Sequence, residues 1–432
     1  MSKAHLLIGA SSSGGGKTTF TAGLLRLLHE RGLRVQPFKC GPDYIDTQYH
    51  KMACGRDSVN LDLWMSSKAH VRHLYHKYST DADVCITEGV MGLFDGFDGM
   101  HGSSAEISAV NGLPVILLVN AKSTSYTVAP LIYGFRHFHP EINIAGVVFN
   151  QVASDKHFAQ LKKACNDTDT ECFGYMPKIK ELEVPSRHLG LTLDASYRFD
   201  AFASQAAEAI AAHVDIDRML EKCTTTTRVC GDYIPAHHRQ DMHIAVAKDE
   251  AFNFTYTENI ERLKEMGQVT YFSPICDKEI PAADMIYLPG GYPEFFLPQL
   301  SSNKDMLKAI SDYAESGGRI LAECGGMMYL CRSITGIDGA TYKMADVLPI
   351  EATMSNMRLH LGYRTLKVGG NIYKGHEFHY SSVNDEQMES IAAITDAKGN
   401  GTGTKLYRHK NVIAGYTHLY WGETDIMKLW EI

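Results

Sequence analysis

The feature that most constrains the fold of this chain is a short apolar stretch that passes through a glycine-rich loop into a helical pattern. Residues 5–10 read HLLIGA, residues 12–18 read SSGGGKT, and apolar side chains then recur with helical spacing over residues 18–31. A strand, such a loop and a helix in this order form the context of a P-loop. The sequence therefore predicts an α/β domain with a phosphate site at this turn.

The residue types of this loop suit phosphate binding. Glycine lets backbone N–H groups turn toward phosphate oxygens, and the following helix adds the positive end of its dipole. Lys17 is expected to reach the β- and γ-phosphates, and the hydroxyl of Thr18 is expected to bind Mg²⁺. Ser11 replaces a glycine of the strict motif, so the match is to a relaxed form. The predicted ATP-binding residues are Ser13, Gly14, Gly15, Gly16, Lys17, Thr18 and Thr19.

Acidic side chains follow two further apolar runs in the same half of the chain. Asp43 and Asp46 lie in a predicted loop, Glu88 closes an apolar strand, and Asp95 follows in a GLFDG segment. The carboxyl ends of parallel strands meet at one edge of a sheet, so these carboxylates are expected near the phosphates. Mg²⁺ prefers oxygen ligands. Thr18, Asp43 and Glu88 are therefore the predicted metal ligands.

The organisation of the chain indicates two α/β domains. In the first half, short runs rich in valine and isoleucine predict a doubly wound parallel sheet. Residues 221–239 lack hydrophobic periodicity, and a second series of strand and helix patterns begins after them. We therefore expect an ATP-binding domain at residues 1–222, a linker at 223–240 and a second α/β domain at 241–432.

The second domain contains a cysteine in a setting typical of a nucleophile. The apolar run 319–323 leads directly into Cys324 and a Gly-Gly pair, which resembles the nucleophile elbow of acyl-transfer enzymes with cysteine in place of serine. The following helix N-terminus is expected to lower the thiol pKa. A second Gly pair ends another strand, and the backbone N–H groups of Gly291 and Gly325 are expected to form an oxyanion hole.

A late histidine supplies the base that a cysteine nucleophile needs. His418 follows a strand-like run about 90 residues after Cys324, and a Cys-His pair is defined by space rather than by sequence distance. His376 and His379, in the segment GHEFHY, are competing candidates.

Composition narrows the class of protein. A formal net charge of -8 and a pI near 6.2 argue against a nucleic-acid surface. No stretch approaches the roughly 20 apolar residues of a membrane span, and the N-terminus lacks a signal-peptide pattern, so we expect a cytoplasmic protein. The ten cysteines show neither CxxC pairs nor zinc-ligand spacing.

With these residues in place, the chain resembles the cobyrinate a,c-diamide synthase family over nearly its whole length. The resemblance rests on an ordered series of motifs: SGGGKTT, FKCGPDYIDTQYH, EGVMGLFDG and SRHLGL, then PGGYPE, AECGGMMYL and GHEFHYS. It implies a dethiobiotin-synthetase-like P-loop domain followed by a class I glutamine amidotransferase domain.

The resemblance also implies a reaction. Cys324, with His418 as base, would release ammonia from L-glutamine, and ATP with Mg²⁺ would phosphorylate a carboxylate of cobyrinate, a corrin tetrapyrrole, before ammonia displaces phosphate. Asp46 and Asp95 would serve the acceptor and acyl-phosphate site, and Tyr44 is a further candidate for contact with the acceptor. Many class I amidotransferases carry Glu two residues after the catalytic His, where this chain has Tyr420, so a Cys-His-Glu triad is not expected.

Several alternatives remain open on sequence alone. Hydrogenobyrinate and nickel-sirohydrochlorin present equivalent acetate groups and could replace cobyrinate as acceptor. Cobyric acid synthase shares both domains, but the GPDYID and EGVMGLFDG segments argue against it. A partition-type P-loop switch is a rival from another class, and it leaves Cys324 without a use. The oligomeric state is also open, a homodimer included.

Overall fold

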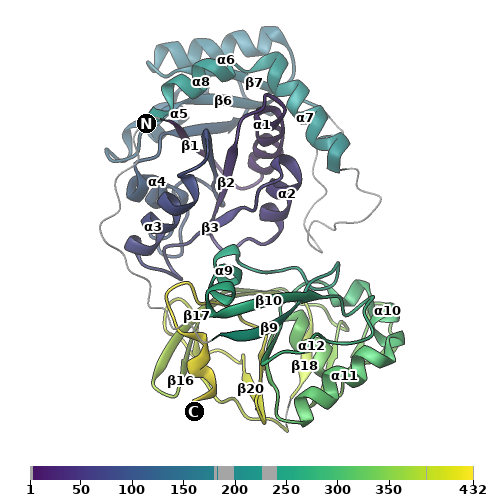
Figure 1. Cartoon of the computed structure of the whole chain (residues 1–432). Coiled ribbons are helices and arrows are strands. Elements are labelled where there is room, and N and C mark those ends of the chain that lie inside the picture. Colours follow the sequence, from purple (N-terminus) through teal and green to yellow (C-terminus); the bar gives the residue numbers. More distant parts are fainter. Residues whose placement is uncertain (1–2, 180–181, 183–198, 226–240, 386, 432) are drawn as a thin grey trace. The chain divides into compact units, whose positions relative to one another are not determined.

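The computed structural model describes residues 3–179, 182, 199–225, 241–385 and 387–431. The chain divides into two compact units, Met1–Tyr233 and Ile234–Ile432 (Figure 1). The SRHLGL motif at 186–191 and most of the expected linker, residues 226–240, lie outside the described residues. Within the described ranges, no helix combines the length and the apolar composition that crossing a membrane requires.

The first unit is built on an eight-stranded sheet. Its main path has the order β3-β2-β4-β1-β5-β6-β7 with all neighbours parallel, and the short β8 pairs antiparallel with β1. The predicted doubly wound α/β sheet is therefore confirmed, and β8 extends it into the start of the expected linker. The strands are β1 (Lys3–Ala10), β2 (Val35–Cys40), β3 (Val59–Leu61), β4 (Val84–Glu88), β5 (Val115–Asn120), β6 (Ile144–Val152), β7 (Cys172–Pro177) and β8 (Thr224–Thr225).

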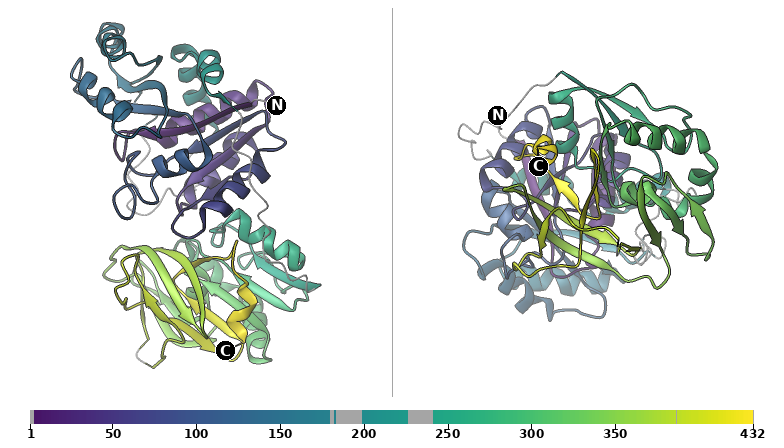
Figure 2. Two further views of the ribbon diagram at one scale, coloured as in Figure 1. Left: turned by 90° about the vertical axis from the view of Figure 1, so that its left-hand side faces the viewer. Right: turned by 90° about the horizontal axis from the view of Figure 1, so that it is seen from below.

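Helices cover both faces of this sheet (Figure 2). One apolar core contains buried residues of α1, α2 and α7, and a second contains residues of α3 to α6. Gly23 lets α1 approach α7 closely, because a Cβ there would lie 2.7 Å from that of Ala206. The helices are α1 (Lys17–Glu30), α2 (Ile45–Cys54), α3 (Lys68–Ser79), α4 (Ser104–Asn111), α5 (Val128–His137), α6 (Asp155–Asp167), α7 (Phe199–His213) and α8 (Ile216–Lys222).

The second unit has a six-stranded sheet in the order β10-β9-β11-β12-β21-β20, parallel except for β20. The second α/β domain expected from the sequence is confirmed, and the following helices and strands build it. They are β9 (Met242–Ala247), α9 (Thr257–Met266), β10 (Gly267–Phe272), β11 (Met285–Leu288), η2 (Pro293–Phe295), α10 (Leu297–Ser302), α11 (Lys304–Glu315), β12 (Arg319–Glu323), α12 (Gly325–Leu330), β20 (Leu406–His409) and β21 (Val412–Gly415).

Two smaller four-stranded sheets, which the sequence reading did not predict, complete the second unit. One has the order β14-β13-β15-β18 and the other β19-β16-β17-β22. Their strands are β13 (Cys331–Thr335), β14 (Thr341–Lys343), β15 (Leu348–Thr353), β16 (His360–Val368), β17 (Asn371–His379), β18 (Ser382–Asn384), β19 (Ala393–Thr395) and β22 (His418–Tyr420), and the helix η3 (Ile426–Trp430) follows. The last sheet carries His418, the base predicted from the sequence.

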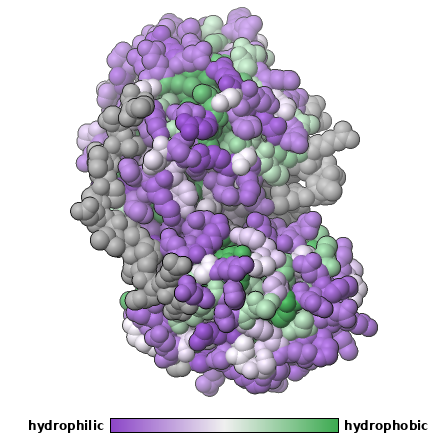
Figure 3. All heavy atoms as spheres, in the orientation of Figure 1, coloured by the Kyte–Doolittle hydropathy of each residue, from purple (hydrophilic) through white to green (hydrophobic). Residues whose placement is uncertain are grey.

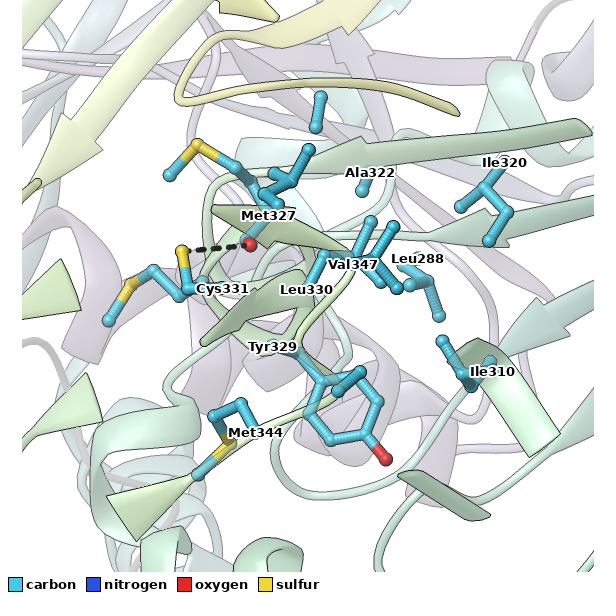
Figure 4. Packing of buried hydrophobic residues seen from close by; sticks show 14 of the residues in the cluster. Leu288, Ile310, Ile320, Ala322, Met327, Tyr329, Leu330, Cys331, Met344 and Val347 are labelled. Carbon is cyan, nitrogen blue, oxygen red and sulfur yellow. Dashed lines mark hydrogen bonds between the residues drawn. The ribbon is translucent and has the colours of Figure 1, made fainter. Parts of the chain in front are cut away.

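Apolar side chains lie mainly inside each unit. On the face drawn in Figure 3, hydrophilic side chains predominate in both units and apolar ones form only small areas. In the second unit, every residue of α12 is buried, and its side chains pack with those of β11, β12 and α11 (Figure 4). This packing fixes the helix that begins directly after Cys324.

Candidate active sites

The P-loop residues line a cavity of about 710 Å³ in the first unit. The loop leaves β1 and ends at Gly16, which precedes α1 in the left-handed region at φ 94°. A Cβ on Gly16 would lie 2.0 Å from Asn150 Nδ2, so this position excludes any side chain. Asn150 also donates from Nδ2 to the carbonyl of Gly15 at 3.0 Å. Predicted residues along the cavity wall are Ser13, Gly14, Gly15, Gly16, Lys17, Thr18, Thr19, Asp43, Asp46 and Glu88.

Thr18 and two of the predicted carboxylates meet at the floor of this cavity. Thr18 Oγ1 donates to Glu88 Oε1 at 2.9 Å and lies 3.4 Å from Asp46 Oδ1. The sequence reading missed Lys39, whose Nζ lies 2.5 Å from Asp46 Oδ2 and 3.0 Å from Glu88 Oε1. Burial alone would lower the pKa of Lys39, but the carboxylates of Asp46 and Glu88 raise it above its usual value. Lys39 is therefore a charged lysine held between two acids.

Asp43 and Asp95 accept hydrogen bonds from backbone N–H groups, and Tyr44 is buried. Asp43 Oδ1 accepts from the backbone N–H groups of Ile45 and Asp46, both at 2.9 Å, and so caps the start of α2. Asp95 Oδ2 accepts from the N–H of Gly92 at 2.9 Å, and Asp95 is not among the cavity-lining residues. Tyr44 is buried, so its ring does not offer a face to a large acceptor in this conformation.

The donor set beside the P-loop fits a magnesium ion that nucleotide phosphates help to hold. Mg²⁺ keeps several waters and usually takes one or two protein carboxylates together with phosphate oxygens. Among the described residues, no group of three or more His, Cys, Asp or Glu side chains is placed to hold a metal ion by itself. Thr18 and Glu88 supply the hydroxyl and the carboxylate that such a shared site needs.

Cys324 occupies the strained turn that the sequence predicts. It lies between β12 and α12 with φ 46° and ψ -106°, and its backbone N–H donates to the carbonyl of Gly415 at 2.8 Å. A non-glycine residue at such a φ is uncommon and marks a position that the surroundings enforce. The expected lowering of the thiol pKa is wrong. Burial, followed by the carboxyl of Glu294, raises the pKa of Cys324 above its usual value and outweighs the Gly325 backbone N–H.

The turn Gly290-Gly291 touches both the histidine and the nucleophile elbow. A Cβ on Gly290 would lie 2.0 Å from His418 Cε1, so the imidazole packs directly against this glycine. A Cβ on Gly325 would lie 3.2 Å from the backbone N of Gly291. The two glycines predicted to form the oxyanion hole are thus neighbours, and His418 lies at the same turn.

His418 suits the role of a base better than its competitors. Burial, with smaller effects from His376 and His379, lowers the pKa of His418 to about 3, and burial lowers the pKa of His379 to about 3 as well. Both rings are therefore neutral, and their positions rather than their pKa values separate them. His379 stacks on Tyr416 with ring centroids 3.6 Å apart, and its Nδ1 lies 2.9 Å from the carbonyl of Ser381. His376 pairs with His418 across β17 and β22, one strand farther from the elbow.

Replacing Gly290 by alanine is expected to push the His418 ring away from the elbow. A misplacement of about 1 Å costs on the order of a hundredfold in rate, so glutaminase activity should fall by about that factor. Glutamate release from glutamine measures this. Gly403→Ala is the matched control, because a Cβ there would meet nothing within 4 Å. Equal activity of the two variants would contradict the placement of His418.

Glu323, which was not predicted from the sequence, links the strands that flank Cys324 and carry His418. Its buried carboxyl lies 2.7 Å from Tyr287 Oη and accepts from the backbone N–H of Leu419 at 3.0 Å, next to His418. Burial raises the pKa of Glu323 to about 8, although these two hydrogen bonds lower it. At neutral pH the carboxyl is therefore protonated, and it ties β12 to β22.

This raised pKa predicts a loss of stability with rising pH. The folded pKa lies above the unfolded value of 4.5, so folding takes up a proton between about pH 4.5 and 8. Stability should fall across that window by up to about 1.4 kcal/mol per pH unit. In Glu323→Gln, the amide oxygen can accept from the N–H of Leu419 and the amide NH₂ can donate to Tyr287 Oη. The amide cannot ionise, so the slope should be shallower. Chemical unfolding of the full chain at several pH values tests this, and an unchanged slope would contradict it.

Comparison with known proteins identifies a nucleotide-binding domain and a glutamine amidotransferase domain. The model of the CobQ/CobB/MinD/ParA nucleotide binding domain matches residues 6–191, and that of the CobB/CobQ-like glutamine amidotransferase domain matches residues 243–426. Two proteins named cobyrinate a,c-diamide synthase align along nearly the whole chain. That of Streptococcus sanguinis is 38% identical over 98% of this chain and 96% of its own length. The protein of Priestia megaterium is 39% identical over 99% of this chain and 96% of its own length. The chain belongs to the cobyrinate a,c-diamide synthase family.

Membership of the cobyrinate a,c-diamide synthase family confirms the resemblance seen in the motifs and the two predicted domain types. The nucleotide-binding match covers the P-loop cavity, and the amidotransferase match covers Cys324 and His418. Tyr420, where many class I amidotransferases have Glu, is buried with its ring edge-on to Tyr256. An apolar contact thus occupies the position of the missing carboxylate.

Proposed function

We propose that this chain converts the a and c acetate carboxylates of cobyrinate into carboxamides, using ATP and ammonia released from L-glutamine. The observation that carries the proposal is the presence of two complementary sites in one chain. One is a P-loop cavity, and the other is a cysteine on a strained strand–helix turn near a buried neutral histidine. The names of the relatives supply the acceptor and the number of amides.

At the amidotransferase site, Cys324 Sγ attacks the side-chain amide carbon of glutamine while His418 takes the thiol proton. The backbone N–H groups of Gly291 and Gly325 stabilise the oxyanion that forms. His418 then returns the proton to the departing ammonia, which leaves a thioester, and water hydrolyses the thioester to glutamate. The raised thiol pKa and the lowered imidazole pKa mean that the resting pair is uncharged. The proton therefore moves only once substrate is bound.

At the nucleotide site, the γ-phosphoryl group of ATP passes to an acetate carboxylate and leaves ADP and an acyl phosphate. Ammonia attacks the acyl carbon, phosphate departs, and a carboxamide remains. Lys17 and the P-loop N–H groups hold the phosphates, and Thr18 with Glu88 would hold Mg²⁺, which supplies charge neutralisation. Asp46, paired with Lys39, and Asp95 serve the acceptor side in this proposal.

The acceptor assignment is tested by comparing three tetrapyrroles under identical conditions. Cobyrinate, hydrogenobyrinate and nickel-sirohydrochlorin are each supplied with glutamine, ATP and Mg²⁺, and amide formation is followed by mass spectrometry. We expect cobyrinate to show the highest kcat/KM and to end as the diamide. A higher kcat/KM for either of the other rings would overturn the acceptor. ATP hydrolysis without amides on any ring would favour a P-loop switch.

A further inference from the structure

Both carboxylate oxygens of Glu88 have protein partners, and the two sets differ. Oε1 accepts from Thr18 Oγ1 at 2.9 Å and from Lys39 Nζ at 3.0 Å. Oε2 lies 2.7 Å from His50 Nε2. The side chains of Glu88 and His50 are 0% and 1% exposed, so water does not compete for these contacts. His50 comes from α2, whereas Glu88 ends β4.

A second hydrogen bond fixes the orientation of the His50 ring. Its Nδ1 lies 2.9 Å from Ser58 Oγ, and Ser58 is buried in the segment between α2 and β3. An ionised carboxylate can only accept, so Nε2 carries the hydrogen and donates to Glu88. In the neutral ring, Nδ1 then accepts from the hydroxyl of Ser58. The series of hydrogen bonds from Ser58 to His50 to Glu88 thus holds Oε2, whereas Thr18 contacts Oε1.

We propose that His50 is a positioning residue that holds Oε2 of Glu88, so that Oε1, which contacts the cavity residues Thr18 and Lys39, is the oxygen that faces the nucleotide site. The inference rests on the proposed nucleotide site but not on the identity of the acceptor. Mg²⁺ demands near-ideal octahedral geometry, whereas Ca²⁺ readily takes a carboxylate through both oxygens. A carboxylate that can offer only one oxygen therefore favours Mg²⁺ over Ca²⁺. Loss of a residue that hydrogen-bonds a metal ligand typically lowers metal affinity by about tenfold to a hundredfold.

The experiment measures metal-dependent nucleotide binding on the full-length protein, without acceptor or glutamine. A non-hydrolysable ATP analogue is titrated by calorimetry at increasing Mg²⁺ and, separately, at increasing Ca²⁺. For His50→Ala we expect the Mg²⁺ midpoint to rise by about tenfold or more, and the preference for Mg²⁺ over Ca²⁺ to shrink. His50→Gln retains an N–H donor for Oε2 and should lie closer to wild type, and Ser58→Ala should fall between them.

His5→Ala is the matched control for loss of a buried histidine. His5 is buried in the same unit, and its Nδ1 lies 3.0 Å from Tyr75 Oη. We expect His5→Ala to leave the Mg²⁺ midpoint and the Mg²⁺ to Ca²⁺ preference unchanged, even if its melting temperature falls.

An unchanged Mg²⁺ midpoint in His50→Ala would overturn the proposal and leave His50 a structural residue. If His50→Ala does not fold, His50→Gln and Ser58→Ala decide the question by the same two midpoints. Because the assay needs no amide formation, failure of the proposed reaction does not affect it. Conversely, a shifted midpoint in an enzyme that amidates no cobyrinate would support His50 while overturning the acceptor.

Discussion

Cys324→Ser is expected to abolish amide formation from glutamine while leaving amide formation from ammonium salts within about twofold of wild type. Removing a covalent nucleophile typically costs far more than a thousandfold. The hydroxyl is a much weaker nucleophile at the same place, and His418 alone cannot form the thioester. The ammonium-dependent reaction uses only the nucleotide site of the first unit, so it should survive.

The control for this prediction is Cys331→Ser. Cys331 is equally buried in the second unit, and its Sγ lies 3.5 Å from the carbonyl of Met327 (Figure 4), but it is not at the elbow. We expect this variant to use both donors. Liquid chromatography with mass detection of the acceptor separates the outcomes. A Cys324→Ser enzyme that still uses glutamine would show that another group releases ammonia.

Lys17→Ala is expected to remove amide formation from both donors, by about a thousandfold or more. A P-loop lysine contacts the β- and γ-phosphates and stabilises the charge that develops during phosphoryl transfer. In the structure, Lys17 Nζ donates to the carbonyl of Met91 at 2.5 Å, and both residues line the cavity. Without ATP-dependent activation of the carboxylate, neither glutamine nor ammonium can yield an amide.

The matched control for Lys17 is Lys51→Ala. Lys51 lies on α2 and pairs with Asp57 at 2.7 Å on the surface, where an ion pair contributes little. Amide formation should be unchanged in this variant. ADP release with ammonium as donor measures both enzymes, and a Lys17→Ala enzyme with near-normal turnover would place ATP elsewhere.

The two loops proposed to hold the active sites could be predicted from sequence because their glycines meet requirements of the local backbone. At Gly16 the backbone turns left-handed and leaves no room for a side chain, and at Cys324 a Gly-Gly pair follows a strand directly. Such requirements are set by neighbours in the chain, so they appear as motifs. The alternation of apolar runs with helical patterns likewise indicated both parallel sheets.

Residues whose surroundings depend on contacts between distant parts of the sequence were not predicted. Lys39, His50 and Glu323 are polar residues in or beside apolar segments. Their partners Glu88, Tyr287 and Leu419 lie 36 to 96 positions away from them. Only the folded sheet brings Glu88 between Lys39 and His50. The sequence held one unused local signal in the hairpin of β16 and β17, where Gly369 and Gly370 both take positive φ in a two-residue turn.

The pKa of the Cys324 thiol shows why a prediction from a local motif can be wrong. The helix after Cys324 begins at the sulfur, as the elbow motif predicts, but it is only six residues long and fully buried. Desolvation of the thiolate and the nearby carboxyl of Glu294 outweigh the favourable backbone N–H. Burial depends on the whole domain, so it could not be read from the motif.

In the proposed function, one chain releases ammonia from glutamine and consumes it in an ATP-driven amidation. The most direct test supplies wild-type enzyme with cobyrinate, ATP, Mg²⁺ and glutamine labelled with ¹⁵N in its side-chain amide, and follows product mass and ADP. We expect a diamide that carries the label at both new amides, with one ADP released for each amide formed. Glutamate and ADP appearing while cobyrinate stays unchanged would contradict it.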